Sequence, residues 1–451
     1  MAKKKQIELT IEEKLQNALV PKEEQPYKIP SNWCWTRWGN LSNNIQYGVN
    51  TPATTEGNAR LVRISDIQEN KIIWDKVPYC NIDDKLVEQY LIKENDILFA
   101  RTGGTVGKSV MAIDVISNAV FAGYLIRSNY SKKLNGKYLK YFMESELYWT
   151  QLKIGTTATA QPNCNGKTLG KMVFPLSPIN EQQRIVNRIE SLFVKLDRAK
   201  ELIENTLAQF EQNKMAILHK AFTGELTAKW RKENNIDLSS WEKIKLGKVL
   251  LPMQTKKPTG QFFRYIDIDA IDNKRQIVKA PKLILTEKAP SRASRGVETG
   301  NILFSMVRPY LKNIAQIDSD LSDCIASTGF YVCRCKPELN SRFLYYLFIF
   351  DKTIDYLMQF MKGDNSPSIR KDDLLNMKID LPTIEEQQEI VNILDDLLAK
   401  YNKIKNLEQQ LEKIELLKKA ILAKAFRGEL GTNNPDEESA ENLLKEILAE
   451  K

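Results

Sequence analysis

The stretch ARTGGTVGKS, residues 100–109, combines glycines with a lysine and a serine, the residue types that bind phosphate groups in nucleotide hydrolases. Those phosphate-binding loops need a glycine five positions before the Gly-Lys pair. This chain has Thr102 at that position, and Gly103 comes one residue too late. The spacing therefore favours a loop with another purpose, and a nucleotide hydrolase that uses residues 100–109 remains an alternative.

Other residues that could do chemistry are sparse. The six cysteines are scattered, and the closest pair, Cys333 and Cys335, has no second pair or histidine near it to complete a zinc site. We expect reduced thiols. The only histidine, His219, lies within a helical pattern, where a surface or packing role is expected. Methyltransferase Asn-Pro-Pro-Tyr motifs, glycine-rich S-adenosylmethionine loops and nuclease carboxylate clusters are absent from the sequence. The sequence thus predicts a chain that is not an enzyme and binds no cofactor or metal.

The length and composition predict more than one domain. The chain has 451 residues, of which 42% are hydrophobic, so it can form sizeable cores. It contains no run of 18 uncharged apolar residues, and its lysine-rich start is not followed by the apolar segment of a signal peptide. We expect a cytoplasmic protein without a membrane partner.

The sequence is a tandem repeat with a period of about 205 residues. Residues 96–99, DILF, recur as NILF at 301–304, and EQQRIV at 181–186 recurs as EQQEIV at 386–391. Each copy has the same order of turn-rich strands, a shorter amphipathic helix, and one long helix. The chain therefore predicts two versions of one fold.

Both long helices carry apolar residues at heptad spacing, from Ile185 to Ile217 and from Ile390 to Ile421. The second series slips in register between Tyr401 and Leu407. Such long helices have more surface than a compact domain buries, so pairing with each other is the economical solution. If the two long helices pair antiparallel, the direct repeats are related by a pseudo-two-fold axis.

These signals predict an α/β protein of the α+β kind, with two tandem globular domains separated by the two long helices. The expected parts are an N-terminal tail at 1–30, a first globular domain at 31–178, a central long helix with its linker at 179–230, a second globular domain at 231–382, a distal long helix at 383–430, and a C-terminal helical tail at 431–451.

The excess positive charge lies in the two globular domains. The net charge of the chain is +9, and residues 31–178 hold 17 Lys and Arg against 12 Asp and Glu, while residues 231–382 hold 25 against 18. Two basic domains joined by helices suggest a polyanion held at two points, and double-stranded DNA fits this pattern.

The second copy of the glycine-rich loop reads SMVRPYLKN and lacks Gly-Lys-Ser, but it carries Arg308 and Lys312. Two copies that read different DNA sequences should share their scaffold and differ in contact loops. The predicted DNA contacts are Arg63, Arg101, Thr102, Lys108 and Lys167 in the first domain, and Arg264, Arg292, Arg295, Arg308, Lys312 and Arg370 in the second.

With these features the chain resembles the specificity subunits of type I restriction-modification systems. The resemblance covers nearly all of residues 27–430 and rests on the segments IPSNW, ILFARTGGTVGK, GTTATAQPNCNGKTLGKMVFPLSPINEQQRIV, AILHKAFTGELT and AILAKAFRGEL. It implies that each globular domain is a target recognition domain for one half of a bipartite, asymmetric site.

The resemblance also implies partners. Two modification subunits would dock on the coiled coil, bind S-adenosylmethionine and methylate adenine, and restriction subunits would translocate and cut DNA with ATP and Mg²⁺. A stand-alone DNA-binding regulator is the alternative, since it would share the basic domains but need no docking helices.

We predict that the linker at 223–234 sets the spacer between half-sites. Inserting four residues, about one helical turn of ~5–6 Å, between Glu225 and Lys229 should lengthen the spacer by one or two base pairs at ~3.4 Å each. The half-sites should stay the same, because the base-reading loops are retained. Sequencing of methylated motifs in cells measures both. An unchanged spacer with full activity would place the ruler elsewhere.

Overall fold

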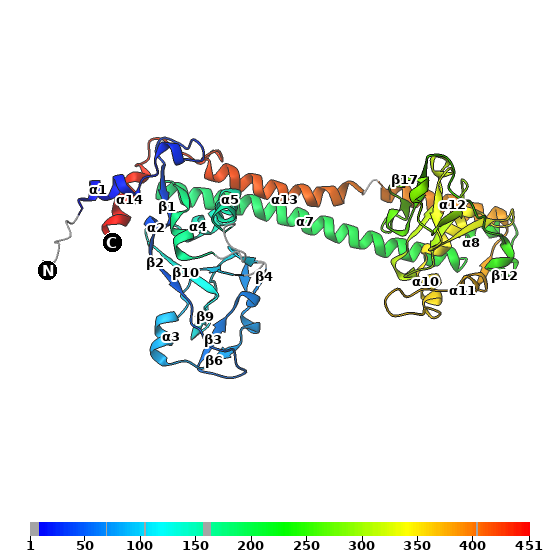
Figure 1. Cartoon of the computed structure of the whole chain (residues 1–451), viewed down its shortest axis with the longest axis horizontal. Helices are drawn as coiled ribbons and strands as arrows, with labels where there is room; N and C mark the ends of the chain where they lie inside the picture. Colours follow the sequence, from blue (N-terminus) through cyan, green and yellow to red (C-terminus); the bar gives the residue numbers. More distant parts are fainter. Residues whose placement is uncertain (1–8, 69, 103–104, 157–163, 403–404) are drawn as a thin grey trace. The chain divides into compact units, whose positions relative to one another are not determined.

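The computed structural model describes residues 9–68, 70–102, 105–156, 164–402 and 405–451 (Figure 1). The contacts divide the chain into two compact units. Unit 1 comprises residues 1–202 and 409–451, and unit 2 comprises residues 203–408. Within the described residues, no helix is long and apolar enough to cross a membrane.

Unit 1 combines short strands with short helices before a long helix begins. Its strands are β1 Cys34–Arg37, β2 Ser42–Tyr47, β3 Ala59–Val62, β4 Ile67–Gln68, β5 Lys71–Ile72, β6 Tyr79–Cys80, β7 Ile97–Ala100, β8 Ser109–Met111, β9 Ala119–Phe121, β10 Leu125–Tyr130 and β11 Val173–Leu176. Its shorter helices are α1 Ile11–Ala18, α2 Trp38–Leu41, α3 Asp84–Tyr90, α4 Gly136–Phe142, α5 Glu146–Thr156, α6 Gly166–Lys171 and α14 Ala440–Ala449.

Unit 2 repeats this plan. Its strands are β12 Glu242–Lys245, β13 Leu250–Leu251, β14 Phe262–Ile266, β15 Ile271–Asp272, β16 Ile277–Val278, β17 Lys282–Leu285, β18 Ala293–Gly296, β19 Ile302–Ser305, β20 Ile314–Gln316, β21 Ile325–Ser327, β22 Phe330–Cys335 and β23 Lys378–Leu381. Its helices are α8 Ala228–Glu233, α9 Ser341–Ile349, α10 Asp351–Met358, α11 Lys371–Leu375 and α12 Ile384–Asn402. The long helices that enter both units are α7 Ile179–Phe222 and α13 Lys405–Phe426.

The sheets of the two units have the same strand order. The four-stranded sheet β2-β10-β7-β8 of unit 1 corresponds to β13-β22-β19-β20 of unit 2, and β6-β3-β9 corresponds to β17-β14-β21, which gains β18 at its edge. The parallel pair β3 with β9 recurs as β14 with β21. The predicted doubling and the mixed α+β fold are therefore confirmed.

In unit 1, α7 and α13 pair antiparallel. Asp197 of α7 forms an ion pair with Lys418, and Lys200, one turn later, pairs with Glu415 at 3.2 Å, so rising numbers on α7 meet falling numbers on α13. The predicted seam residue Ile185 is fully buried in the same core as Leu422. Apolar packing, framed by these ion pairs, holds the two helices together.

In unit 2, the last turns of α7 share a core with α12. Leu218 and Ala221 of α7 lie in the same buried cluster as Ile390 and Leu394 of α12. The predicted distal helix is thus built from α12 and α13, and the expected register slip falls where they meet. Ile404, one of the predicted seam residues, lies outside the described residues.

A buried carboxylate anchors the start of α7 in unit 1. Glu181 is fully buried and accepts a hydrogen bond from the Trp33 indole at 2.7 Å. It also accepts hydrogen bonds from the Asn433 amide at 2.8 Å and the Thr432 hydroxyl at 3.3 Å, in the segment that follows α13. One side chain therefore joins the globular domain to both long helices.

Unit 2 builds the same anchor at the start of α12. Glu386, also fully buried, accepts hydrogen bonds from the Trp241 indole at 2.9 Å and the Thr227 hydroxyl at 2.6 Å. The Arg231 guanidinium of α8 adds an ion pair at 2.5 Å. Thr227 follows α7 as Thr432 follows α13, so the segments GELT and GELGT play equivalent parts.

An asparagine caps the equivalent helix in each unit. The Asn135 side chain accepts hydrogen bonds from the first backbone N–H groups of α4, and Asn340 does the same for α9. The backbone N–H of Asn135 donates to Gln182 at 3.0 Å, and that of Asn340 donates to Gln387 at 2.8 Å. The Glu-Gln-Gln segment therefore orients a second helix as well.

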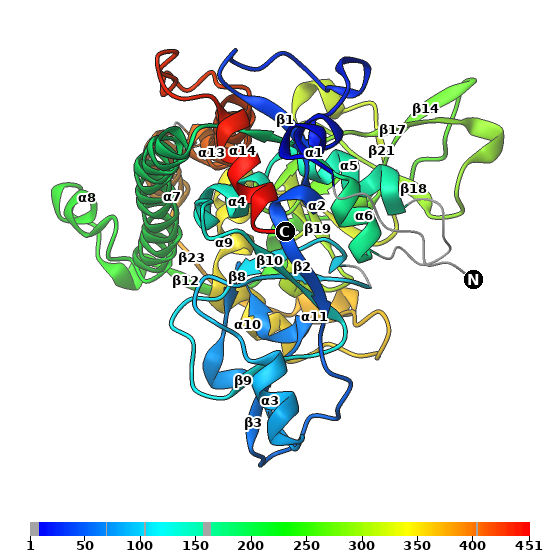
Figure 2. The same cartoon turned by 90° about the vertical axis from the view of Figure 1, so that its left-hand side faces the viewer.

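Unit 1 has an additional layer made by the two ends of the chain. Helix α14 packs against α1 and α2, as Figure 2 shows from the side of unit 1. Leu444 and Ile447 of α14 are fully buried with Leu15 of α1 in the core of unit 1. Helix α14 lies within the segment predicted as a C-terminal helical tail, 431–451, and it packs into the core of unit 1.

The cysteines are free thiols, as expected, and five of them are buried. Burial raises the pKa of Cys164 to about 12 and that of Cys324 to about 11, so both stay protonated at neutral pH. His219 is exposed on α7 with its ring 6.2 Å from that of Phe350, a surface position as expected.

Replacing Arg231 with Met should destabilise unit 2 by ~3–5 kcal/mol, because it leaves the buried Glu386 carboxylate without its cation. Urea unfolding followed by tryptophan fluorescence measures this, since the guanidinium lies 5.9 Å from the Trp241 ring. Lys229→Met is the matched control, because Lys229 and its partner Glu233 are 89% and 62% exposed and such pairs contribute only ~0–0.5 kcal/mol. Equal unfolding midpoints for the two variants would show that Arg231 does not stabilise the anchor.

Candidate DNA-binding interface

The glycine-rich stretch that resembled a phosphate-binding loop connects two strands. Its Lys108-Ser109 end leads into β8, and β7 pairs with β8 in an antiparallel hairpin. The backbone N–H of Ala100 donates to the Lys108 carbonyl at 2.8 Å, and the N–H of Gly107 donates to the Ala100 carbonyl at 2.8 Å. A phosphate-binding loop must open a helix whose N–H groups face the phosphate. The nucleotide-hydrolase alternative is therefore wrong for this loop, although Gly103 and Gly104 lie outside the described residues.

Gly107 is required by this hairpin. Its φ is +82°, and a Cβ at this position would lie 1.9 Å from Leu152 Cδ2. The equivalent residue of unit 2, Lys312, also has a left-handed backbone, with φ +50°. The two hairpins therefore share a left-handed residue at this position although their sequences differ.

Backbone hydrogen bonds define which loop residues are equivalent. The N–H of Arg101 donates to the Tyr124 carbonyl at 2.9 Å, and the N–H of Met306 donates to the Gly329 carbonyl at 2.9 Å. In addition, the Arg101 carbonyl accepts a hydrogen bond from the N–H of Cys164 at 2.9 Å, and the Met306 carbonyl accepts one from the N–H of Ile369 at 3.0 Å. Arg101 thus corresponds to Met306, and Arg308 lies two residues farther along the loop.

Arg101 lies beside a tyrosine and close to another predicted contact. Its guanidinium carbon is 4.9 Å from the centre of the Tyr47 ring. The Tyr47 hydroxyl accepts a hydrogen bond from the backbone N–H of Gly166 at 3.0 Å, and the next residue, Lys167, is exposed on α6. The structure therefore brings Arg101 to the ring of Tyr47 and places Lys167 next to the residue that binds the hydroxyl of the same tyrosine. Lys108 and Thr102, from the same loop, are half-buried.

The Arg308 side chain is exposed on a strained loop. Its φ of +48° is left-handed, and its backbone N–H donates to the Pro367 carbonyl at 2.8 Å. The guanidinium donates to the Asn365 carbonyl at 2.9 Å. These bonds fix Arg308 against the loop at 361–370, where Arg370 is also exposed. Two predicted contacts of unit 2 therefore share one edge.

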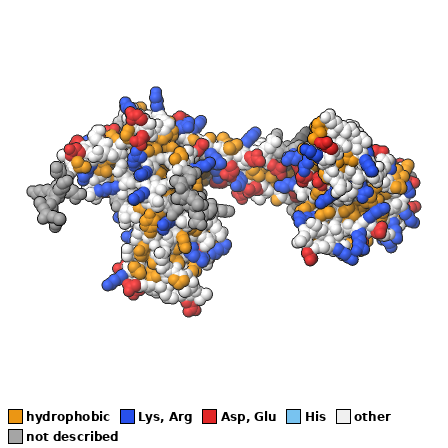
Figure 3. Space-filling model, in the orientation of Figure 1, with side chains coloured by type: hydrophobic (Ala, Val, Ile, Leu, Met, Phe, Trp, Pro, Cys, Tyr) orange, Lys and Arg blue, Asp and Glu red, His pale blue; other side chains and the backbone are white. Residues whose placement is uncertain are grey.

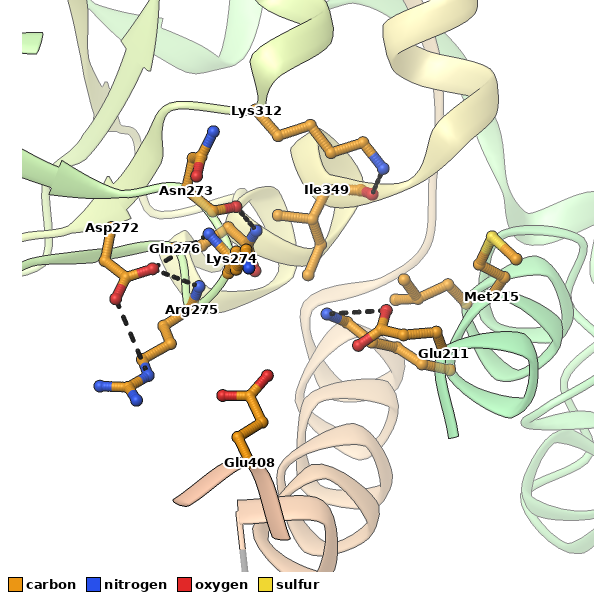
Figure 4. Close-up of a pocket in the computed structure, with 12 residues that line it drawn as sticks. Glu211, Met215, Asp272, Asn273, Lys274, Arg275, Gln276, Lys312, Ile349 and Glu408 are labelled. Carbon is orange, nitrogen blue, oxygen red and sulfur yellow. Dashed lines mark hydrogen bonds and ion pairs between the residues drawn. The ribbon is translucent and has the colours of Figure 1, made fainter. Parts of the chain in front are cut away.

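The Lys312 side chain is bound to the junction of α9 and α10. Figure 4 shows its side chain directed toward Ile349 at a cavity of about 470 Å³. Its ammonium donates to the Ile349 carbonyl at 3.1 Å and forms an ion pair with Asp351. This placement gives Lys312 a role in holding the end of α9 and the start of α10 to the hairpin.

Two other predicted arginines are held by carboxylates. Arg63 pairs with Asp66 at 2.8 Å, and this hydrogen-bonded carboxylate raises the pKa of the Arg63 guanidinium. Arg264 pairs with Asp323 at 2.9 Å and is one-third exposed. An arginine already bound to a carboxylate must give up that partner before it binds a phosphate.

The remaining predicted arginines lie at the edge strand β18, which has no counterpart among the described strands of unit 1. Arg292 is exposed just before this strand. Arg295 lies within it, and its buried Nε has no hydrogen-bond partner among the described residues. In the view of Figure 3, Lys and Arg side chains are spread over the surfaces of both units, in keeping with the basic charge of both domains.

Sequence reasoning missed the aromatic side chains beside the basic residues. Tyr47 and Tyr124 are 40% and 66% exposed, and Tyr79, with Arg60 4.4 Å above its ring, is 37% exposed. Each of these tyrosines is far in sequence from its basic neighbour. The only available signal was a large aromatic residue beside a turn glycine, as in Tyr47-Gly48 and Gly123-Tyr124.

The described residues contain no group of three or more His, Cys, Asp or Glu side chains that could hold a metal ion.

The doubled fold with differing loops has counterparts among known proteins. The profile of the type I restriction modification DNA specificity domain matches residues 54–211 and 241–416. The chain belongs to this family.

Individual relatives agree with the profile. The specificity subunit of the type I restriction enzyme EcoBI from Escherichia coli is 27% identical over 355 residues, which are 70% of this chain and 72% of that protein. The HsdS subunit from Thermoanaerobacter tengcongensis has a TM-score of 0.53 at 21% identity over 90% of this chain and 99% of that one. A chain solved in work on the assembly and conformational transition of a type I R-M system has a TM-score of 0.67 at 21% identity, over 90% of this chain and 100% of that one. The specificity-subunit fold is therefore shared.

We predict that Arg308→Ala weakens binding through the second half-site by ~1–3 kcal/mol if the guanidinium is bidentate to guanine. If Arg308 contacts phosphate instead, the loss should be smaller and nonspecific, and the slope of log affinity against log salt should fall by about one. Arg101→Ala should act in the same way on the first half-site. Salt titrations with duplexes that carry one intact half-site separate these results.

Lys312→Met is the matched control for Arg308→Ala, because it removes a nearby positive charge that is directed into unit 2. It should leave the salt slope unchanged. Unchanged affinity and slope for Arg308→Ala as well would remove this loop from the DNA interface.

Proposed function

We propose that this chain is the sequence-reading subunit of a type I restriction-modification assembly, in which each unit reads one half of a bipartite site in double-stranded DNA. One observation carries the proposal. The two units repeat the strand order and the buried Glu181 and Glu386 anchors, yet they differ in the loops that follow β7 and β19. A shared scaffold with differing contact loops is what two related readers of different sequences require.

The site is asymmetric because the loops differ. A dimer of identical readers binds a palindrome, since both halves present the same side chains. Here the position of Arg101 in unit 1 is Met306 in unit 2, so the two half-sites must differ in sequence. A single chain with two unlike halves therefore reads a non-palindromic site.

In the proposed assembly this chain recognises DNA and the partner subunits do the chemistry. Modification subunits bind S-adenosylmethionine and methylate adenine within the half-sites, and restriction subunits use ATP and Mg²⁺ to translocate and cut. The residues of this chain position the partners on the sequence, and none takes part in a covalent step.

The long helices are the proposed docking surface for the modification subunits. Val194 of α7 is 67% exposed, and Leu416 and Leu417 of α13 are 63% and 50% exposed, although these helices already share a buried seam. Figure 3 shows acidic and basic side chains interspersed along these helices, with apolar side chains among them. Exposed apolar residues on a paired helix suit a further helix from a partner, and a stand-alone regulator has no use for them.

We predict that exchanging residues 31–178 for the first domain of another family member changes one half-site and leaves the other intact. The physical reason is that each unit has its own cores and its own anchor, so its loops fold independently of the other unit. Sequencing methylated motifs in cells that also express the modification subunits measures the outcome. The reciprocal exchange of residues 231–382 is the control and should change only the other half-site.

A change in both half-sites would contradict independent reading. Purification without partners tests the regulator alternative. A regulator would bind its full site tightly alone, whereas the proposed subunit should bind specifically only when the modification subunits are present.

A further inference from the structure

At one corner of unit 1 an arginine lies over one tyrosine ring and is bonded through its backbone to a second tyrosine. The Arg101 guanidinium lies 4.9 Å from the centre of the Tyr47 ring. The Arg101 backbone is hydrogen-bonded to Tyr124, which is 66% exposed at the turn between β9 and β10. These three residues come from three separate segments, and the fold alone brings them together. We refer to them as the Tyr-Arg-Tyr corner.

The position of Arg101 is fixed from several sides. Its backbone N–H donates to the Tyr124 carbonyl, and its carbonyl accepts from the N–H of Cys164, both at 2.9 Å. The Tyr47 ring is fixed in turn, because its hydroxyl accepts the N–H of Gly166 at 3.0 Å. An arginine held in this way loses little side-chain entropy on binding, and the Tyr47 ring sets the plane of its guanidinium.

Unit 2 has the same backbone arrangement without these side chains. Met306 takes the place of Arg101, with its carbonyl bonded to the N–H of Ile369 at 3.0 Å as that of Arg101 is to Cys164. Gly329 takes the place of Tyr124. Asn44 of β2 pairs with Asn129 of β10, and Leu251 of β13 pairs with Arg334, the residue of β22 that corresponds to Asn129. Leu251 therefore corresponds to Asn44. Tyr47, three residues after Asn44, corresponds to Gln254.

All three side chains of the corner are therefore replaced together, while Met306 repeats the backbone hydrogen bonds of Arg101. A corner that served folding would keep its side chains in both units. A corner that reads a base in one half-site should lose them in the unit that reads a different sequence.

The chemistry of the corner fits guanine. Stacking on Tyr47 uses the face of the guanidinium and sets the direction of its in-plane N–H groups. Two such N–H groups match the O6 and N7 acceptors of guanine in the major groove. A phosphate contact needs positive charge but no fixed plane, so it would not call for a stacked arginine.

We propose that the Tyr-Arg-Tyr corner reads one guanine of the first half-site, an inference that rests on the proposed function. Arg101 donates to O6 and N7 of that guanine, Tyr47 is a positioning residue that holds the guanidinium plane, and Tyr124 contacts the neighbouring nucleotide. Unit 2 has no equivalent reader and recognises its half-site through other residues.

The test uses the full-length chain co-expressed with the modification subunits of its source organism. Selection from randomised duplexes, with methylated motifs sequenced in parallel, gives the base preference at every position of both half-sites. Arg101→Lys keeps the charge and removes the bidentate fork. Tyr47→Leu removes the ring, and Tyr47→Phe keeps the ring and loses only the hydroxyl.

Unit 1 offers a matched control. Arg60 stacks on Tyr79 at 4.4 Å, and its guanidinium is committed to the Trp74 carbonyl at 3.0 Å. Tyr79→Leu therefore breaks a second Tyr-Arg stack of unit 1, one that lies away from the loop after β7. Thermal melting of every variant shows whether the fold is retained.

Arg101→Lys and Tyr47→Leu should both reduce the preference for guanine at one and the same position of the first half-site, by about 10- to 100-fold. Tyr124→Ala should lower affinity through that half-site and keep the guanine preference. Tyr47→Phe, Tyr79→Leu and every position of the second half-site should match the unaltered protein.

If Arg101→Lys keeps the full guanine preference at every position, the proposal is wrong. The result for Arg101→Lys tests the proposal even if Tyr47→Leu does not fold. Loss of preference in Arg101→Lys but not in a folded Tyr47→Leu would overturn the role of Tyr47. If the unaltered protein selects no bipartite site, the proposed function itself is wrong. If it selects a bipartite site that the corner variants leave unchanged, only the role of the corner is wrong.

Discussion

The buried carboxylate at the start of each long helix pair is the constraint on which the structure depends. Glu181 and Glu386 are fully buried, and a buried carboxylate is tolerated only when its oxygens are hydrogen-bonded. Their partners come from the globular domain, through Trp33 or Trp241, and from the segment after the other long helix. Loss of a partner leaves a buried carboxylate oxygen with fewer hydrogen bonds. This requirement fixes where the domain, the beginning of one helix and the end of another must meet.

The two anchors are satisfied in different ways. Glu386 has the Arg231 guanidinium, itself buried, and this cation also donates to the Gly224 carbonyl at the end of α7. Glu181 is bonded by neutral groups, among them the Asn433 amide, and the neighbouring Arg184 pairs instead with Glu437 at 2.6 Å. The end of the first long helix is therefore clamped by an internal ion pair. The end of the second is clamped by a surface ion pair and by the packing of α14.

A scaffold fixed in this way leaves its loops free to vary. The hairpins after β7 and β19 share the hydrogen bond from the N–H of Ala100 or Ser305 to the carbonyl of Lys108 or Asn313, and each has a left-handed residue, Gly107 in one and Lys312 in the other. With the backbone secured, side chains at the same positions can change from Arg101 to Met306 without disturbing the core. Recognition can then diverge between the units while their stability is maintained, which is how one fold can serve two different half-sites.

The sequence by itself determined the doubling, the α+β class, the long helices and the basic character of both domains, because these depend on local spacing and composition. Heptad spacing is readable within one helix, and a repeat is readable wherever residues recur. Which basic residues face outward could be settled only by tertiary structure. Arg308 and Lys312 lie four residues apart in one loop. The Arg308 side chain is exposed, whereas the Lys312 ammonium is bound to Asp351 and the Ile349 carbonyl within unit 2. Tyr47 and Arg101 meet although 54 positions separate them, since β2 and β7 both pair with β10. Contacts made across strands depend on sheet register, and no local pattern in the chain records that register.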